Sequence, residues 1–120
     1  KESFAYFMEM GTGKSKVFIT TNQKTKMGGY RDVSDCERFG TPTVLFENPR
    51  QVQVNSIRFV GIVEQKLKDF TSEDFLLLMG DPVLIGICCT VAAKKTNNKF
   101  KVLKWDREQS IYIPIIIELA

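Results

Sequence analysis

The chain has 120 residues, of which 43% are hydrophobic and 26% are charged, and its formal net charge is +3. This length predicts one domain, and the composition excludes a disordered or low-complexity chain. The chain contains no histidine, which excludes Ser-His-Asp catalysis, Cys-His catalysis and any zinc site with a histidine ligand.

The chain has three cysteines, Cys36, Cys88 and Cys89, and an odd number argues against a fully paired, secreted disulfide framework. Cys88 and Cys89 lie in an apolar run, where cysteine usually behaves as a small buried hydrophobe. We therefore expect buried free thiols and a reducing cytoplasm, which would be the host cytoplasm for a viral protein. No apolar run reaches the roughly 18 residues of a membrane-spanning helix, so no membrane contact is expected.

The first part of the chain predicts two strands, at residues 2–10 and 16–22, around a glycine-containing loop. Residues 1–29 are therefore expected to form an N-terminal hairpin or arm. Residues 23–40 predict a long polar loop, with a short turn of helix near 34–38. A compact domain is expected over residues 30–120, within a chain that forms a single domain overall.

The run from Phe7 to Ser15 resembles motif I of superfamily-2 helicases. The resemblance implies a phosphate site in which backbone N–H groups and a lysine hold the phosphates and a hydroxyl reaches Mg²⁺. Its residues would be Gly11, Gly13, Lys14 and Ser15. A P-loop opens a helix, whereas the β-branched residues after Ser15 favour a strand. A lysine-bearing turn is therefore the alternative interpretation.

The middle of the chain predicts further elements of both kinds. Residues 41–47 predict a short strand, and the alternation over 51–63 predicts a long one. Residues 71–79 favour a helix that starts with two acids and ends at Gly80, although a strand over 75–79 is the alternative.

Asp81 and Pro82 predict the start of the best-defined helix, with a capping acid and a proline at its first position. The helix is expected over 83–93 and nearly wholly buried, because apolar residues recur at spacings of three and four. Gly86 would allow a neighbouring strand to approach the helix closely.

Residues 99–106 and 111–119 predict a pair of strands, and Pro114 indicates an edge or bulged position for the second. Lysines alternate with apolar residues in the first strand, so one of its faces is expected to be lysine-rich. The expected fold is α+β, with an antiparallel or mixed sheet of about four to six strands. One or two helices between about 71 and 95 would pack on one face of this sheet.

Six cations and one tryptophan lie in or next to this strand pair, and we call this set the basic hairpin. Its residues are Lys94, Lys95, Lys99, Lys101, Lys104, Trp105 and Arg107. Lysines with nearby aromatic rings would follow a phosphate backbone and stack on bases. The alternative interpretation places the aromatic rings in the core and the lysines on a solvated face that prevents edge-to-edge association.

Three runs, Gly80–Pro82, Leu103–Arg107 and Tyr112–Ile115, make residues 30–119 resemble small accessory proteins of tailed phages. The resemblance implies binding to nucleic acid or to the transcription machinery of the host.

We therefore expect a non-enzymatic accessory protein without metal or cofactor. Its partner would be nucleic acid or a nucleic-acid-processing enzyme such as RNA polymerase, bound by the basic hairpin. The alternatives are nucleotide-phosphate binding at residues 11–15 and a self-assembling structural subunit. The sequence leaves the partner's identity and the oligomeric state open.

Overall fold

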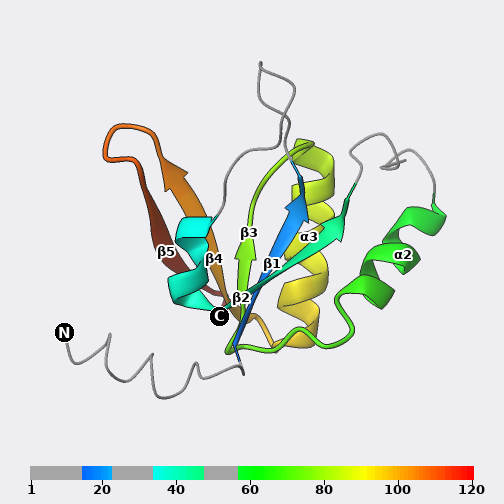
Figure 1. Cartoon of the computed structure of the whole chain (residues 1–120). Helices are drawn as coiled ribbons and strands as arrows, with labels where there is room; N and C mark the ends of the chain where they lie inside the picture. Colours follow the sequence, from blue (N-terminus) through cyan, green and yellow to red (C-terminus); the bar gives the residue numbers. More distant parts are fainter. Residues whose placement is uncertain (1–14, 23–33, 48–56) are drawn as a thin grey trace.

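The computed structural model of the chain describes residues 15–22, 34–47 and 57–120 (Figure 1). Five strands form one sheet in the order β2-β1-β3-β4-β5. Their bounds are Lys16–Thr21 for β1, Thr41–Phe46 for β2, Phe75–Leu77 for β3, Lys99–Asp106 for β4 and Ile111–Glu118 for β5. Strands β1 to β4 run parallel to one another, and β5 is antiparallel to β4.

Helices cover both faces of the sheet (Figure 1). The α-helices α2 (Arg58–Lys66) and α3 (Pro82–Lys95) pack on one face, and the 3₁₀-helix η1 (Ser34–Phe39) packs on the other. Successive residues of β1 point to opposite sides, so Phe18 joins the core under α2 and α3 while Val17 joins the core under η1. The prediction of an α+β fold with an antiparallel or mixed sheet and one or two helices on one face is confirmed, although α2 lies before the range of about 71–95 in which the helices were expected.

The strand at the start of the described chain lies inside the sheet. β1 pairs with β2 on one side and with β3 on the other. It therefore belongs to the same sheet as the elements after residue 30. The strand expected at residues 2–10 and most of the loop expected at 23–40 lie outside the described residues.

The long strand expected over 51–63 is wrong from residue 58 onward, where the chain forms α2. Residues 51–56 lie outside the described part of the chain. The residues of this segment that reach the core are Phe59, Val63 and Leu67, which recur every four positions as on a helix face. Val60 and Ile62 produced the strand-like alternation, yet both are exposed on the outer side of α2.

The helix expected over 71–79 is also wrong, because Phe75–Leu77 form β3. All three residues are buried between β1 and β4, with one core on each face of the sheet. A strand buried on both faces reads as a continuous apolar run, which periodicity alone does not separate from a buried helix.

Two side chains hold β1 and β3 together at the ends of their short pairing. At the start, the buried Asp74 carboxylate accepts hydrogen bonds from the Lys16 backbone N–H (2.9 Å) and the Thr71 backbone N–H (2.8 Å). At the other end, the buried Thr20 hydroxyl accepts from the Met79 N–H (2.7 Å) and donates to the Met79 carbonyl oxygen. These bonds extend a strand pair whose own register covers only residues 17–19 and 75–77.

The helix predicted after Asp81 is confirmed as α3, and the Asp81 carboxylate caps it by accepting from the Val83 and Leu84 N–H groups at 2.7 and 3.3 Å. The expectation of nearly complete burial is wrong, since Val83, Gly86 and Thr90 are exposed. A Cβ added at Gly86 would meet no atom within 4 Å, so the expected close approach of a strand is absent there. No helix in the described parts of the chain is long and apolar enough to cross a membrane.

The three cysteines are free thiols: Cys36 and Cys88 are buried, and Cys89 is half-buried. Burial raises the pKa of Cys36 from 9.0 to about 11, and the neighbouring carboxylate of Glu37 adds to this rise. Burial raises the pKa of Cys88 to about 12. The sequence-based expectation of buried thiols therefore holds fully for two of the three, and neither of these is a thiolate near neutral pH.

Gly80 joins β3 to α3 with a backbone that other residues rarely adopt. Its φ is +94°, and a Cβ placed on it would lie 2.3 Å from Cγ2 of Thr21. Thr21 is buried and its hydroxyl donates to the Phe46 carbonyl oxygen at 2.9 Å, so rotating this side chain would break a hydrogen bond. The turn therefore requires glycine for both conformation and space.

We expect Gly80→Ala to lower the free energy of unfolding by about 1–3 kcal/mol, because it adds backbone strain to a steric clash. Gly86→Ala is the matched control, since it makes the same change at an exposed helix position with free space. It should raise stability by about 0.5–1 kcal/mol. Urea unfolding of both variants measures the difference, and equal effects would contradict the described turn.

We expect Cys36 and Cys88 to resist a thiol-specific disulfide reagent at pH 8 in the native protein, with Cys89 reacting first. All three should react at once in guanidinium chloride. The folded pKa values of Cys36 and Cys88 lie above 9.0, because burial disfavours the thiolate. The stabilisation from burying these two protonated thiols is therefore fully present below pH 9 and is lost as the pH rises toward 11–12. Mass spectrometry of the labelled peptides identifies each thiol, and immediate native labelling of Cys88 would contradict its burial.

Candidate functional site

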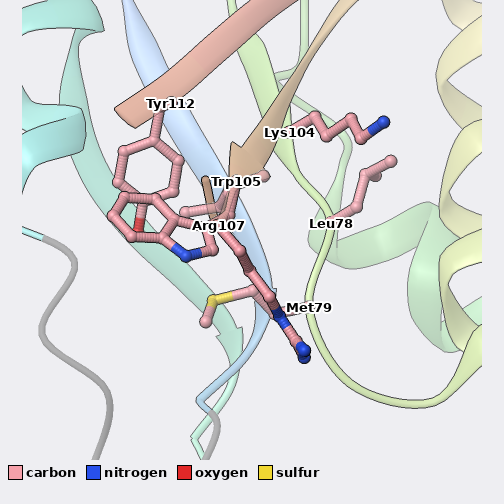
Figure 2. A pocket seen from close by; sticks show the side chains of 7 residues that line it. Leu78, Met79, Lys104, Trp105, Arg107 and Tyr112 are labelled. Atoms are coloured by element: carbon pink, nitrogen blue, oxygen red, sulfur yellow. The ribbon is translucent and has the colours of Figure 1, made fainter. Parts of the chain in front are cut away.

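A pocket of about 260 Å³ opens where β3 and β4 end, and we call it the carboxyl-edge pocket (Figure 2). β3 and β4 are parallel, so their carboxyl ends and the segments that follow them meet at one edge of the sheet. The lining residues are Leu77, Leu78, Met79, Lys104, Trp105, Arg107 and Tyr112.

This edge is where the topology of the sheet favours a ligand. The chain passes from β1 to β2 on one side, and then returns across β1 to β3 on the other. In open sheets of parallel strands, ligands bind outside the carboxyl ends of the strands, near the point where the strand order reverses. Leu78 and Met79 directly follow β3, one of the two strands that flank this reversal.

The segment after β3 is fixed before any ligand arrives. The Thr20 hydroxyl bonds both backbone groups of Met79, Gly80 packs against Thr21, and the Asp81 carboxylate caps α3. One wall of the carboxyl-edge pocket is therefore tied to β1 and to α3. A wall held in this way loses little conformational entropy when a ligand binds.

Two aromatic rings form the opposite wall. The centroids of Trp105 and Tyr112 lie 4.8 Å apart with an interplanar angle of 60°, an edge-to-face arrangement. Tyr112 is buried and Trp105 is half-buried. The contact with Tyr112 therefore fixes the indole of Trp105, while part of the indole surface is accessible to a ligand. Figure 2 shows the two rings next to each other at the pocket.

The charged groups that line the carboxyl-edge pocket are both cations. Lys104 and Arg107 are exposed, and their side chains extend in different directions from the pocket (Figure 2). No carboxylate is among the lining residues. The pocket therefore favours an anionic ligand, and its indole and methionine offer an apolar or aromatic contact beside the charges.

The other cations of the basic hairpin lie elsewhere. Lys94 and Lys95 end α3 and Lys99 begins β4, so these three exposed side chains lie toward the amino ends of the parallel strands. The five residue-to-residue steps of strand between Lys99 and Lys104 span roughly 15–20 Å. The structure thus brings Lys104, Trp105 and Arg107 together and separates them from the remaining cations.

The prediction of one lysine-rich face on β4 is wrong. Phe100 and Val102 point into the core under α2 and α3, and Lys104 shares their side of the strand. Lys101 lies on the side of Leu103, which faces the core under η1.

Lys101 is engaged within the protein itself. Its ammonium group donates to the Glu73 carbonyl oxygen at 3.2 Å and lies 4.3 Å from the centre of the Phe75 ring. Burial lowers the pKa of Lys101, while the nearby carboxylates of Glu73 and Asp74 act in the opposite direction. This lysine therefore has a structural role at the start of β3, whatever else it contacts.

The alternative phosphate site is described only at its last residue. Gly11, Gly13 and Lys14 lie outside the described residues, and Ser15 is buried immediately before β1. The residues that follow form a strand rather than a helix, so the segment does not aim a helix N-terminus at a phosphate. Across residues 15–22, 34–47 and 57–120, no three His, Cys, Asp or Glu side chains gather as metal ligands would.

Sequence reasoning found the cationic and indole residues of the carboxyl-edge pocket but missed Leu78, Met79 and Tyr112. Leu78 and Met79 approach Lys104 because β3 lies beside β4 in the sheet, whereas Tyr112 approaches it because β5 pairs with β4. The available signal was the apolar run ending in Gly80-Asp81-Pro82, since ligand sites commonly follow strands of this kind.

The sequence comparison identifies one family. The model of the family described as phage Pam3 gp32-like protein matches residues 15–119, which span every described element. The matched residues begin after most of the run that resembles the helicase motif. Comparison with curated proteins and with solved structures gives no match. The expected likeness to phage proteins is therefore confirmed, and the chain belongs to the family of phage Pam3 gp32-like proteins.

Proposed function

We propose that this phage protein binds single-stranded nucleic acid at the carboxyl-edge pocket, without catalysing a reaction. The observation that carries the proposal is the meeting of Lys104, Arg107 and a partly accessible Trp105 at one cavity that no carboxylate lines. Proteins that bind single strands combine these two features, which are cations for the phosphates and aromatic rings for the bases.

The electrostatic part of the proposal rests on Lys104 and Arg107. Each exposed cation that meets a phosphate releases condensed counterions, so binding weakens as salt is added. Since the two side chains extend in different directions (Figure 2), they suit successive phosphates of a strand better than one isolated phosphate group. A single strand passing the pocket would meet both cations.

The aromatic part of the proposal rests on Trp105. Stacking of a base on an aromatic side chain contributes about 1–3 kcal/mol. The edge-to-face contact with Tyr112 holds the indole while leaving it half-exposed, so little side-chain entropy is lost on stacking. Base stacking tolerates different sequences, which predicts little sequence preference.

The absence of catalysis is proposed from the lining of the carboxyl-edge pocket. Its residues include no carboxylate and no thiol, and Tyr112 is their only hydroxyl group. They therefore do not form a nucleophile with an adjacent base. The buried Cys36 and Cys88 have raised pKa values and line no part of this pocket.

We expect the double variant Lys104→Glu with Arg107→Glu to weaken binding of a fluorescent oligothymidine by at least about tenfold at low salt, because it replaces two phosphate contacts with repulsion. The matched control is Lys95→Glu with Lys99→Glu, which changes the net charge equally at the other edge of the sheet. Fluorescence anisotropy measures the affinity. Quenching of Trp105, the chain's single tryptophan, reports stacking directly.

Two results would contradict the proposal. Equal losses in both double variants would indicate general charge attraction rather than a site at the carboxyl-edge pocket. No binding of the unchanged protein at 50 mM salt, together with nuclease-resistant capture of a nucleic-acid-processing enzyme from the host, would assign the pocket to a protein partner. Circular dichroism of each variant confirms that it is folded.

A further inference from the structure

The outer edge of β5 is apolar and has no neighbouring strand among the described elements. β5 ends the strand order of the sheet and is eight residues long. Four of the eight large hydrophobic side chains that are exposed in the described chain belong to this strand or follow it directly, namely Ile111, Ile115, Ile116 and Leu119. Glu118 is the only charged residue of the strand, so the edge lacks the cations that commonly prevent pairing.

The direction of each backbone group of β5 follows from its pairing with β4. The Leu119 N–H donates to the Asn98 carbonyl oxygen at 2.9 Å, one position beyond the paired residues Lys99 and Glu118. In an antiparallel pair, residues alternate between bonding their neighbour and facing away from it. Odd-numbered residues of β5 therefore bond β4, and even-numbered residues direct their N–H and C=O groups outward. Pro114 is even-numbered, so its missing N–H falls on the free edge.

From this arrangement we propose that β5 pairs antiparallel with β5 of a second copy of the chain, centred on Ile115. This register places Pro114 opposite Ile116 of the second copy. Each proline has no N–H group to donate, so the ladder between the two strands lacks one hydrogen bond at each Pro114 and no others. A register centred on Pro114 would set proline against proline and lose both bonds at the centre.

The side chains of this pairing are self-complementary. Residues opposite each other in an antiparallel pair share a face of the sheet. Ile115 then meets Ile115 of the second copy, Ile113 meets Ile117, and Ile111 meets Leu119. Every odd-numbered position therefore forms an apolar cross-strand contact. A second β5 is therefore a better partner for β5 than a strand that carries polar side chains on this face.

The charges favour the same arrangement. In the antiparallel pairing Glu118 lies opposite Tyr112 of the second copy, and the two Glu118 carboxylates are separated by six residues of strand, on the order of 20 Å. This distance exceeds the Debye length of about 8–10 Å at physiological salt. Parallel pairing in register would bring Glu118 beside Glu118 and Pro114 beside Pro114.

A groove beside β5 continues the apolar surface. It lies between α3 and the end of β5, with a volume of about 560 Å³, and its lining includes Phe100, Ile117 and Leu119. In the proposed pairing, Ile111 of the second copy reaches Leu119 at the end of this groove. Of the residues that line the carboxyl-edge pocket, only Tyr112 belongs to β5. Self-association through β5 would therefore leave the pocket open, and it is independent of the proposed nucleic-acid binding.

We expect sedimentation velocity across a concentration series to show a dimer, and Ile115→Lys to raise its dissociation constant at least about tenfold. The matched control is Val83→Lys, which places the same charge on a similarly exposed apolar side chain at the start of α3 (53% exposed, against 40% for Ile115). It should leave the dimer intact. A monomer at every concentration of the unchanged protein, or equal dissociation in both variants, would overturn the proposal.

A cysteine at the centre of the pairing tests its register. In a Cys89→Ser background, Ile115→Cys should form a covalent dimer under mild oxidation, because Cα atoms of such opposite residues lie about 4.5 Å apart, within disulfide range. Ile113→Cys should not, since its counterpart in the second copy would be four positions away. Equal crosslinking at both positions, or crosslinking at neither, would overturn the proposed register. Melting curves of the variants show whether each is folded.

Discussion

The structure depends on how the three-residue strand β3 is held in the middle of the sheet. β3 pairs with β1 only over Phe75–Leu77, and few backbone bonds would fix so short a strand. Asp74 and Thr20 complete the attachment by binding the backbone of Lys16 and Met79 at opposite ends. Both side chains are buried. Removing the Thr20 hydroxyl would leave the buried Met79 N–H group without its partner, which costs about 1–3 kcal/mol. Removing the Asp74 carboxylate would leave the part-buried Lys16 N–H group without its partner. The same contacts place Met79 in the wall of the carboxyl-edge pocket and lead through Gly80 into α3.

Local chemical signals in the sequence were sufficient for several elements. The acid and proline at 81 and 82 predicted the start of α3. The strands β1, β2, β4 and β5 lie where β-branched and alternating residues predicted them. The segments 58–66 and 75–77 were misassigned because their decisive property is burial by distant elements. Val60 and Ile62 look like the inner positions of a strand until the packing of Phe59 and Val63 against the sheet is known.

The candidate site was also predictable only in part, because local signals identify its charged residues but not the distant residues that join them. The positive charges and the tryptophan could be read directly, but the strand's two-residue period sends Lys101 and Lys104 to opposite faces. Strand order then decides which distant residues join them. Met79 reaches the carboxyl-edge pocket because β3 lies beside β4, whereas Tyr112 reaches it through the hairpin of β4 and β5. Strand order is a property of the whole fold, and no local pattern around Lys104 contains it. The exposed edge of β5 was partly foreseeable from Pro114, whereas the direction of its free backbone groups required the register with β4.

The position of β1 also governs how the chain folds during synthesis. β1 leaves the ribosome before β3, and both β3 and the Met79 carbonyl group that accepts from the Thr20 hydroxyl follow nearly 60 positions later. Parallel strands far apart in sequence pair slowly, since a long loop must close before any contact forms. Until then Val17, Phe18 and Ile19 can pair only with β2, which follows about 25 positions later, and the edge of β1 that meets β3 has no partner. A nascent chain without β3 therefore exposes an unpaired apolar edge of β1, and unpaired strand edges of this kind make partly folded chains prone to aggregation.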